Sequence, residues 1–160
     1  MMVIFMAVKQ QKLSASLEDY LEAIYNLAGK SNITRSKDIA EQLGVSRASV
    51  TGALRALKEK GLANYKPYNY ISLTESGRKA AAEIVKKHEI LKSFFTTVLN
   101  VNPDTAQNAA CKAEHALGPE IIAKLLSFIE FVGQEGKTNA NDFLEEFEKF
   151  CNEREKKIKG

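Results

Sequence analysis

Residues 34–60 constrain the fold more strongly than any other part of the chain, because they combine two short helices with a tight turn. Ser36 can cap a first helix that ends at Gly44, a residue that turns the chain without a Cβ penalty. Ser46 can cap a second helix. The second helix carries a buried stripe at helical spacing, formed by Val50, Leu54 and Leu57. A short helix, a glycine turn and a second helix with a polar outer face form the helix-turn-helix pattern.

The outer face of the second predicted helix carries small hydrogen-bonding and basic side chains. These are Arg47, Ala48, Ser49, Thr51 and Arg55. Side chains of this kind approach base edges and phosphates closely. This face is therefore a candidate for sequence recognition in DNA.

A change in hydrophobic period after Gly61 predicts a β-hairpin. Residues 62–65 and 70–73 read as two short strands around a turn at residues 66–69. A hairpin that directly follows a helix-turn-helix is a wing, and Lys66 and Tyr68 are its candidate contacts with the DNA backbone. The combination predicts a winged-helix DNA-binding domain over residues 1–75.

The charge distribution agrees with a polyanion as partner. Residues 1–79 hold 12 Lys and Arg against 7 Asp and Glu, a balance of +5, whereas the remaining residues balance at −2. A basic half of this kind suits DNA, although many solvated surfaces have a similar composition.

A second motif, on a predicted helix that Asn102 and Pro103 open, suggests half of a metal site. Its thiol, carboxylate and imidazole stand at positions i, i+3 and i+4, which share one face of a helix. These residues are Cys111, Glu114 and His115. Candidates for the other half are the Asp19 and Glu22 pair and His88, which falls on the buried side of a long helix over residues 74–99. Each residue alone is more often an ordinary core or surface group.

Residues 76–160 read as an all-helical second domain. The run at residues 120–132 has more apolar surface than one helix can bury against a small domain, so we expect a homodimer interface there. One more amphipathic helix is expected over residues 142–158.

Composition excludes several protein classes. The 160 residues are 44% hydrophobic and 27% charged, which is typical of a globular protein. The apolar opening, residues 1–8, is too short to span a bilayer and does not read as a signal peptide, and two cysteines do not make a disulfide framework. We therefore expect a cytoplasmic protein without a membrane partner. No separate catalytic base or substrate pocket is indicated, so an enzyme is not expected.

Five segments, taken in order, resemble the diphtheria toxin repressor family of metal-dependent transcriptional repressors, including its manganese transport regulator branch. They are SLEDYLEAIYNL, SKDIAEQLGVSRASVTGALRALKEKGL, LTESGRKAA, KKHEILKSFF and NAACKAEHAL. The resemblance implies a mainly α protein, with an N-terminal winged helix-turn-helix domain and an all-helical dimerisation and metal-binding domain. Too few residues remain for the SH3-like domain of larger members, so none is expected. By position, the family's ligands fall on Asp19, Glu22, His88, Cys111, Glu114 and His115.

The expected metal follows from these ligand types. Carboxylates and imidazoles suit Mn²⁺ and Fe²⁺, whereas a thiolate favours Fe²⁺, Co²⁺, Ni²⁺ or Zn²⁺. Cys111 stands where iron-responsive members have cysteine and manganese regulators have glutamate. Fe²⁺ is therefore the first expectation and Mn²⁺ the second, with Zn²⁺, Co²⁺ or Ni²⁺ able to bind in vitro. Gln107 and Lys92 depart from the second metal site of iron-responsive members.

Together with these patterns, the resemblance implies a homodimeric repressor that senses intracellular Fe²⁺ or Mn²⁺, binds a palindromic operator in double-stranded DNA and controls metal-uptake genes. Two other functions fit the same residues. One is a winged-helix regulator that responds to a small molecule or to oxidation of Cys111. The other is a winged-helix protein interaction module that does not recognise a DNA sequence.

Overall fold

The computed structural model describes residues 13–66, 70–132 and 139–159, which form two compact units, Met1–Ala82 and Glu83–Gly160. The apolar residues 1–8 and Tyr68 of the hairpin lie outside the described residues. The prediction of a mainly α protein is confirmed. Every helix in the described ranges falls short of the length or the apolarity needed to cross a membrane.

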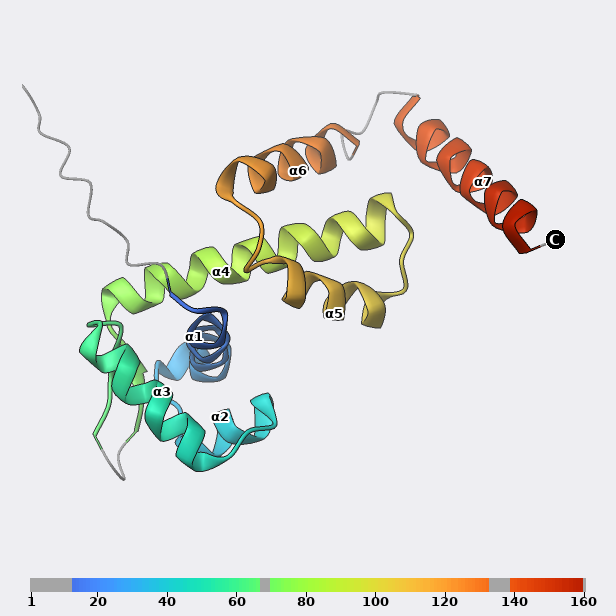
Figure 1. Cartoon of the computed structure of the whole chain (residues 1–160). Coiled ribbons are helices and arrows are strands. Elements are labelled where there is room, and N and C mark those ends of the chain that lie inside the picture. Colours follow the sequence, from blue (N-terminus) through green and yellow to red (C-terminus); the bar gives the residue numbers. More distant parts are fainter. Residues whose placement is uncertain (1–12, 67–69, 133–138, 160) are drawn as a thin grey trace, which may run out of the picture. The chain divides into compact units, whose positions relative to one another are not determined.

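Three helices that contact one another build the first unit (Figure 1). They are α1 (Ala15–Ala28), α2 (Ser36–Leu43) and α3 (Arg47–Glu59). Two serine caps fix where helices begin: Ser14 Oγ accepts from the Leu17 N–H at 3.3 Å, and Ser46 Oγ accepts from the Ser49 N–H at 3.1 Å. Gly44 ends α2 with a φ of 63°, a conformation that suits glycine. The helix-turn-helix prediction is therefore confirmed.

The predicted cap of α2 is wrong by one residue. Arg35, not Ser36, is the N-cap, and Ser36 is already the first residue of the helix. Arg35 is extended because Thr34, next to it, pairs with Ile71 through two backbone hydrogen bonds of 2.9 Å. A contact distant in sequence therefore sets the start of this helix.

The wing consists of β1 (Ala63–Asn64) and β2 (Ser72–Leu73), which are shorter than the predicted strands. They are antiparallel, with Ala63 opposite Leu73 and Asn64 opposite Ser72. The Thr34 to Ile71 bridge adds a third segment of extended chain, which the sequence pattern did not indicate. The wing is thereby attached to the start of α2.

Among the described residues, apolar side chains make up the most deeply buried layer of the three-helix unit. The largest of those with no exposed surface are Leu21, Ile24, Ile39, Val50, Leu54, Leu57 and Ile71. They come from α1, α2, α3 and the wing, so all four parts share one core. This core holds the outer face of α3 toward solvent.

Helix α4 (Glu75–Ser93) begins at a tight junction with the wing. Thr74 caps it, accepting from the Gly77 N–H at 3.0 Å and donating to the Gly61 carbonyl at 2.7 Å. A Cβ at Gly77 would lie 1.8 Å from the Leu62 carbonyl oxygen, so only glycine fits without a backbone shift. The predicted helix to Leu99 is interrupted, because residues Phe94–Val98 form a π-helical turn.

Helices α5 (Pro103–Ala113), α6 (Pro119–Val132) and α7 (Asn139–Lys159) complete the second unit. Asn102 caps α5, accepting from the Asp104 N–H at 2.9 Å, as predicted. A small core joins α4, α5 and α6 through Ile90, Leu91, Ala110 and Ile122. Helix α7 is linked to the turn after the π segment by a 2.7 Å hydrogen bond from Asn100 to Glu148.

Candidate metal centre and nucleic-acid interface

The end of α5 places the carboxylate of Glu114 in the interior of the second unit. Glu114 is the C-cap of α5 and His115 lies beyond it, so the prediction that both belong to the helix is wrong. The α-helical pattern ends here because the Ala116 N–H bonds to the carbonyl three residues back, at Ala113, at 3.0 Å, as in a tighter turn. Glu114 nevertheless keeps helical dihedrals, and it is only 1% exposed.

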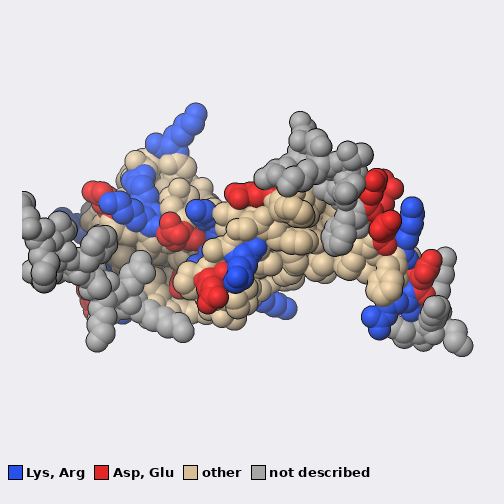
Figure 2. Space-filling model, turned by 90° about the horizontal axis from the view of Figure 1, so that it is seen from above, with Lys and Arg blue, Asp and Glu red and all other residues tan. Residues whose placement is uncertain are grey.

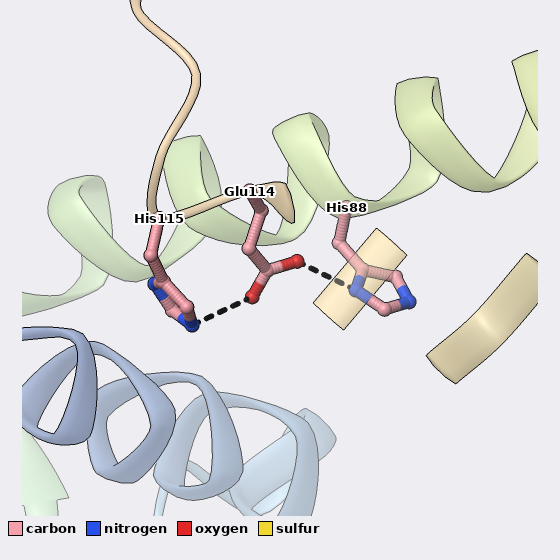
Figure 3. Close-up of polar contacts among 3 residues, drawn as sticks. All are labelled: His88, Glu114 and His115. Carbon is pink, nitrogen blue, oxygen red and sulfur yellow. Dashed lines mark hydrogen bonds and ion pairs between the residues drawn. The ribbon is translucent and has the colours of Figure 1, made fainter. Parts of the chain in front are cut away.

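Two imidazoles flank the Glu114 carboxylate, as Figure 3 shows. His88 Nδ1 lies 2.6 Å from Glu114 Oε2, and His115 Nε2 lies 3.5 Å from Glu114 Oε1. His88 is on α4 and 4% exposed, in the apolar stripe where the sequence placed it. Charge-assisted hydrogen bonds are strong in a buried environment, so this cluster fixes the end of α5 against α4.

The second nitrogen of His88 provides a test of whether a metal fits. In the part of the chain that the structure describes, the buried Nε2 of His88 has no hydrogen-bond partner. A histidine that donates from Nδ1 to a carboxylate presents a lone pair on Nε2, which is the arrangement common in metal-binding histidines. A buried polar atom without a partner is costly unless a ligand satisfies it. The donor set therefore fits a divalent cation.

Cys111 is exposed on α5, with its Sγ within 4.8 Å of a Glu114 carboxylate oxygen. The structure thus brings Cys111, His88 and His115 close to one carboxylate within the second unit. Asp19 and Glu22 belong to α1 of the first unit, three residues apart and both half-buried. Nitrogen, oxygen and sulfur donors together suit a first-row transition ion better than Ca²⁺ or Mg²⁺.

The candidate nucleic-acid interface lies on α3. Arg47, Ala48, Ser49 and Arg55 are exposed, and Thr51 is half-buried, with its hydroxyl donating to the Arg47 carbonyl at 3.0 Å. The opposite side of α3 is buried. Lys66 on the wing is also exposed. The helix therefore presents the side chains that the sequence placed on its outer face.

Charge is mixed on the face seen in Figure 2. Lys and Arg side chains alternate there with Asp and Glu, with uncharged surface between them. A mixed face gives no broad attraction for a polyanion. The candidate interface therefore rests on the exposed residues of α3 and the wing, and not on a basic surface in this view.

Sequence reasoning missed one exposed cation, Arg35. Its guanidinium donates to the Tyr70 hydroxyl at 2.7 Å and lies 5.0 Å from the centre of the Tyr70 ring. The hydrogen bond to Tyr70 raises the pKa of Arg35, a group that is charged in proteins even without this shift. The two residues are 35 positions apart, and the pairing of Thr34 with Ile71 brings them together.

Both halves of the chain match families of known proteins. Residues 12–71 match the iron dependent repressor N-terminal DNA binding domain, and residues 74–140 match the iron dependent repressor metal binding and dimerisation domain. An HTH-type transcriptional regulator of Methanocaldococcus jannaschii, MJ0568, is 39% identical over 119 residues, covering 74% of this chain and 95% of that protein. The transcriptional regulator MntR of Salmonella typhimurium is 31% identical over 126 residues, covering 79% and 80%.

Solved structures agree with these matches. A manganese-dependent transcriptional repressor in complex with manganese is 29% identical, with a TM-score of 0.66 over 72% of this chain. IdeR of T. acidophilum is 25% identical, with a TM-score of 0.64 over 71% of this chain. The chain covers 53% of each of those chains, so it spans about half their length.

Proposed function

The chain belongs to the iron-dependent repressor family of metal-sensing, DNA-binding transcriptional regulators, and from this premise we propose that it represses metal-uptake genes in response to intracellular Fe²⁺ or Mn²⁺. It acts in the cytoplasm as a homodimer on a palindromic operator. One observation carries the proposal. The buried carboxylate of Glu114 lies between two imidazoles, and the buried Nε2 of one of them, His88, has no hydrogen-bond partner among the described residues.

The ligand set combines residues of both units. His88, Cys111, Glu114 and His115 come from the second unit, where contacts within the structure support them. Asp19 and Glu22 come from α1 and rest on the family resemblance. Carboxylates that gather at one place repel one another, and a bound divalent cation supplies the positive charge that reverses this repulsion.

The position of these ligands in the chain suggests how DNA binding is controlled. Asp19 and Glu22 belong to the unit that carries α3, whereas the other ligands belong to the unit that dimerises. When all of them hold one ion, the DNA-binding units of a dimer keep fewer orientations relative to each other. Two recognition helices at a fixed separation can then enter successive major grooves. A coupling of this type is typically about 1–3 kcal/mol, and DNA binding tightens metal binding by the same factor.

The identity of the metal depends on Cys111. A thiolate among hard ligands favours Fe²⁺ over Mn²⁺, whereas similarity to a manganese-dependent repressor solved in complex with manganese favours Mn²⁺. We propose Fe²⁺ first and Mn²⁺ second, with Zn²⁺, Co²⁺ and Ni²⁺ as ions that bind in vitro.

On the DNA side, we propose that Arg47, Ala48, Ser49, Thr51 and Arg55 of α3 meet the major groove. Their exposure on one side of a helix with a buried opposite face supports this role. Lys66 and Tyr68 of the wing are proposed contacts with the DNA backbone.

A metal series tests the proposed function. A labelled duplex selected from a random pool by the full chain is titrated under anaerobic conditions, and fluorescence anisotropy is followed with Fe²⁺, Mn²⁺, Co²⁺, Zn²⁺ or a chelator. We expect tight binding with Fe²⁺ or Mn²⁺ and weak binding with chelator. Equal binding under all conditions would contradict metal sensing, and a failure to select any duplex would favour an interaction module.

A further inference from the structure

The start of α2 and the wing meet at one pair of opposite residues. Thr34 and Ile71 exchange both of their backbone hydrogen bonds, each 2.9 Å long, in an antiparallel bridge. The next residues outward along the two segments are Arg35 and Tyr70. In an antiparallel pair such residues face each other, so their side chains can interact directly.

The side chains of this pair make two contacts. Arg35 Nη2 donates to Tyr70 Oη at 2.7 Å, and the guanidinium carbon lies 5.0 Å from the centre of the ring. The second distance is within the range of a cation–π interaction. Both side chains are exposed, Tyr70 by 53%. The contacts therefore orient a cation at the surface without burying it.

The pair keeps most of its hydrogen-bonding capacity. A guanidinium has five N–H donors, and the contact with Tyr70 uses one of them. The Tyr70 hydroxyl accepts in that contact and keeps its own proton to donate. Because the acceptor is a neutral phenol, the charge of Arg35 is not cancelled by it. Several donors and one positive charge together match the oxygens of a phosphate.

We propose that Arg35 and Tyr70 form a phosphate-binding pair that contacts the DNA backbone beside the groove that α3 enters. The inference rests on the proposed function as a DNA-binding regulator. In a helix-turn-helix, the helix before the recognition helix crosses the DNA backbone. That helix is α2 here, and Arg35 is the residue at its N-terminal end. Tyr70 stands on the wing between the turn and β2, so a single phosphate contact joins the start of α2 to the wing.

The experiment measures salt dependence, because each phosphate contact releases counterions. The metal, Mn²⁺ or Fe²⁺, is the one that activates DNA binding, and it is kept at a saturating concentration. The full chain is then titrated into a labelled selected duplex, or into a scrambled duplex, at a series of KCl concentrations. We expect Arg35→Gln to weaken binding to both duplexes about tenfold. The slope of log affinity against log salt is negative, and we expect its magnitude to decrease by about 0.9 for each copy of Arg35 that is replaced in the dimer.

Three further variants distinguish a DNA contact from a structural role. Lys79→Gln removes the same charge from α4, where Lys79 is paired with Glu75 at 2.8 Å, and we expect an unchanged slope. Arg35→Lys keeps the charge but loses the planar group, so we expect a slope near the wild type and intermediate affinity. Tyr70→Phe removes only the hydroxyl, and we expect a smaller loss that disappears in an Arg35→Gln background.

The outcomes are separable. If Arg35→Gln lowers the melting temperature by circular dichroism but leaves the salt slope equal to that of Lys79→Gln, the pair is structural and the inference is overturned. If the wild-type chain binds no duplex, both the inference and the proposed function are overturned. If the wild type binds in a metal-dependent way and Arg35→Gln binds equally well, only the inference is overturned.

Discussion

The two units of this protein differ in the polar groups that they bury. In the first unit the deepest side chains are apolar, for example Leu21 and Leu54, and the candidate DNA contacts lie on the surface of α3. In the second unit His88 and Glu114 are buried, whereas apolar Ile121 on α6 is 49% exposed. The candidate DNA contacts of the first unit therefore lie outside an apolar core, whereas two candidate metal ligands of the second unit, His88 and Glu114, are buried.

This difference shows where each unit can change without losing its fold. Surface substitutions on the first unit alter binding while the apolar core remains. A buried polar cluster is different, because removal of one partner leaves the other buried and unsatisfied. Exposed apolar surface on the second unit also requires a partner. We therefore expect the stability of the second unit to depend more strongly on metal and on dimerisation than the stability of the first unit does.

The largest expected effect is on the core of the first unit. Leu54→Ala removes a fully buried side chain and should lower the free energy of unfolding by about 2–5 kcal/mol. Ile122→Ala in the smaller core of the second unit should cost less, because several of its apolar neighbours are only partly buried. Urea denaturation with amide hydrogen exchange locates each loss. A larger loss in the free energy of unfolding for Ile122→Ala than for Leu54→Ala would contradict this expectation.

Next is the buried cluster of the second unit. Glu114→Gln keeps the shape and a hydrogen-bonding group but removes the charge, so Mn²⁺ affinity should fall about 100-fold. Isothermal titration measures this. The matched control is Glu120→Gln, at an exposed glutamate of α6, and it should bind Mn²⁺ like the wild type. Equal affinity in the two variants would place the metal elsewhere.

A comparison of two exposed isoleucines tests the apolar surface. Ile121→Glu on α6 should weaken the dimer about thirtyfold, because it places a charge in an apolar interface. Ile33→Glu, at a residue of the first unit that is 40% exposed, should leave the dimer intact. Sedimentation equilibrium gives both dissociation constants. A monomer produced by Ile33→Glu alone would move the interface to the first unit.

The smallest effect concerns the junction of α4 with the wing. Gly77→Ala should cost about 1–3 kcal/mol, because its Cβ would meet the Leu62 carbonyl and the backbone must shift. Gly52→Ala on α3 has open space around it and should be neutral or stabilising. Thermal denaturation compares the two. If both variants were equally stable, the close approach at Gly77 would not restrict the sequence.

Local features of the sequence were the ones that could be predicted correctly. The caps at Ser46 and Asn102 and the turn at Gly44 each depend on hydrogen bonds between residues two to four positions apart. Such bonds are available to the chain before any tertiary contact forms. The winged-helix order and the outer face of α3 followed from these signals and from the apolar period.

The candidate site was only partly predictable for the same reason. The sequence placed His88 on a buried helical face, and the structure confirms that position. It could not show that α5 ends before Glu114, because that end depends on the turn leading into α6. The sequence did not indicate Arg35 as the N-cap of α2, because that position depends on the bridge between Thr34 and Ile71.

The sequence by itself thus determined the order of the elements, the helix starts set by local caps and the two groups of residues with metal- or DNA-binding chemistry. Tertiary structure alone decided which of these groups meet. Glu114 lies against His88, and Arg35 lies against Tyr70, because packed helices and a strand bridge bring together residues far apart in the chain. Short-range hydrogen bonds are readable from adjacent letters, whereas burial and pairing across the fold depend on the whole chain at once.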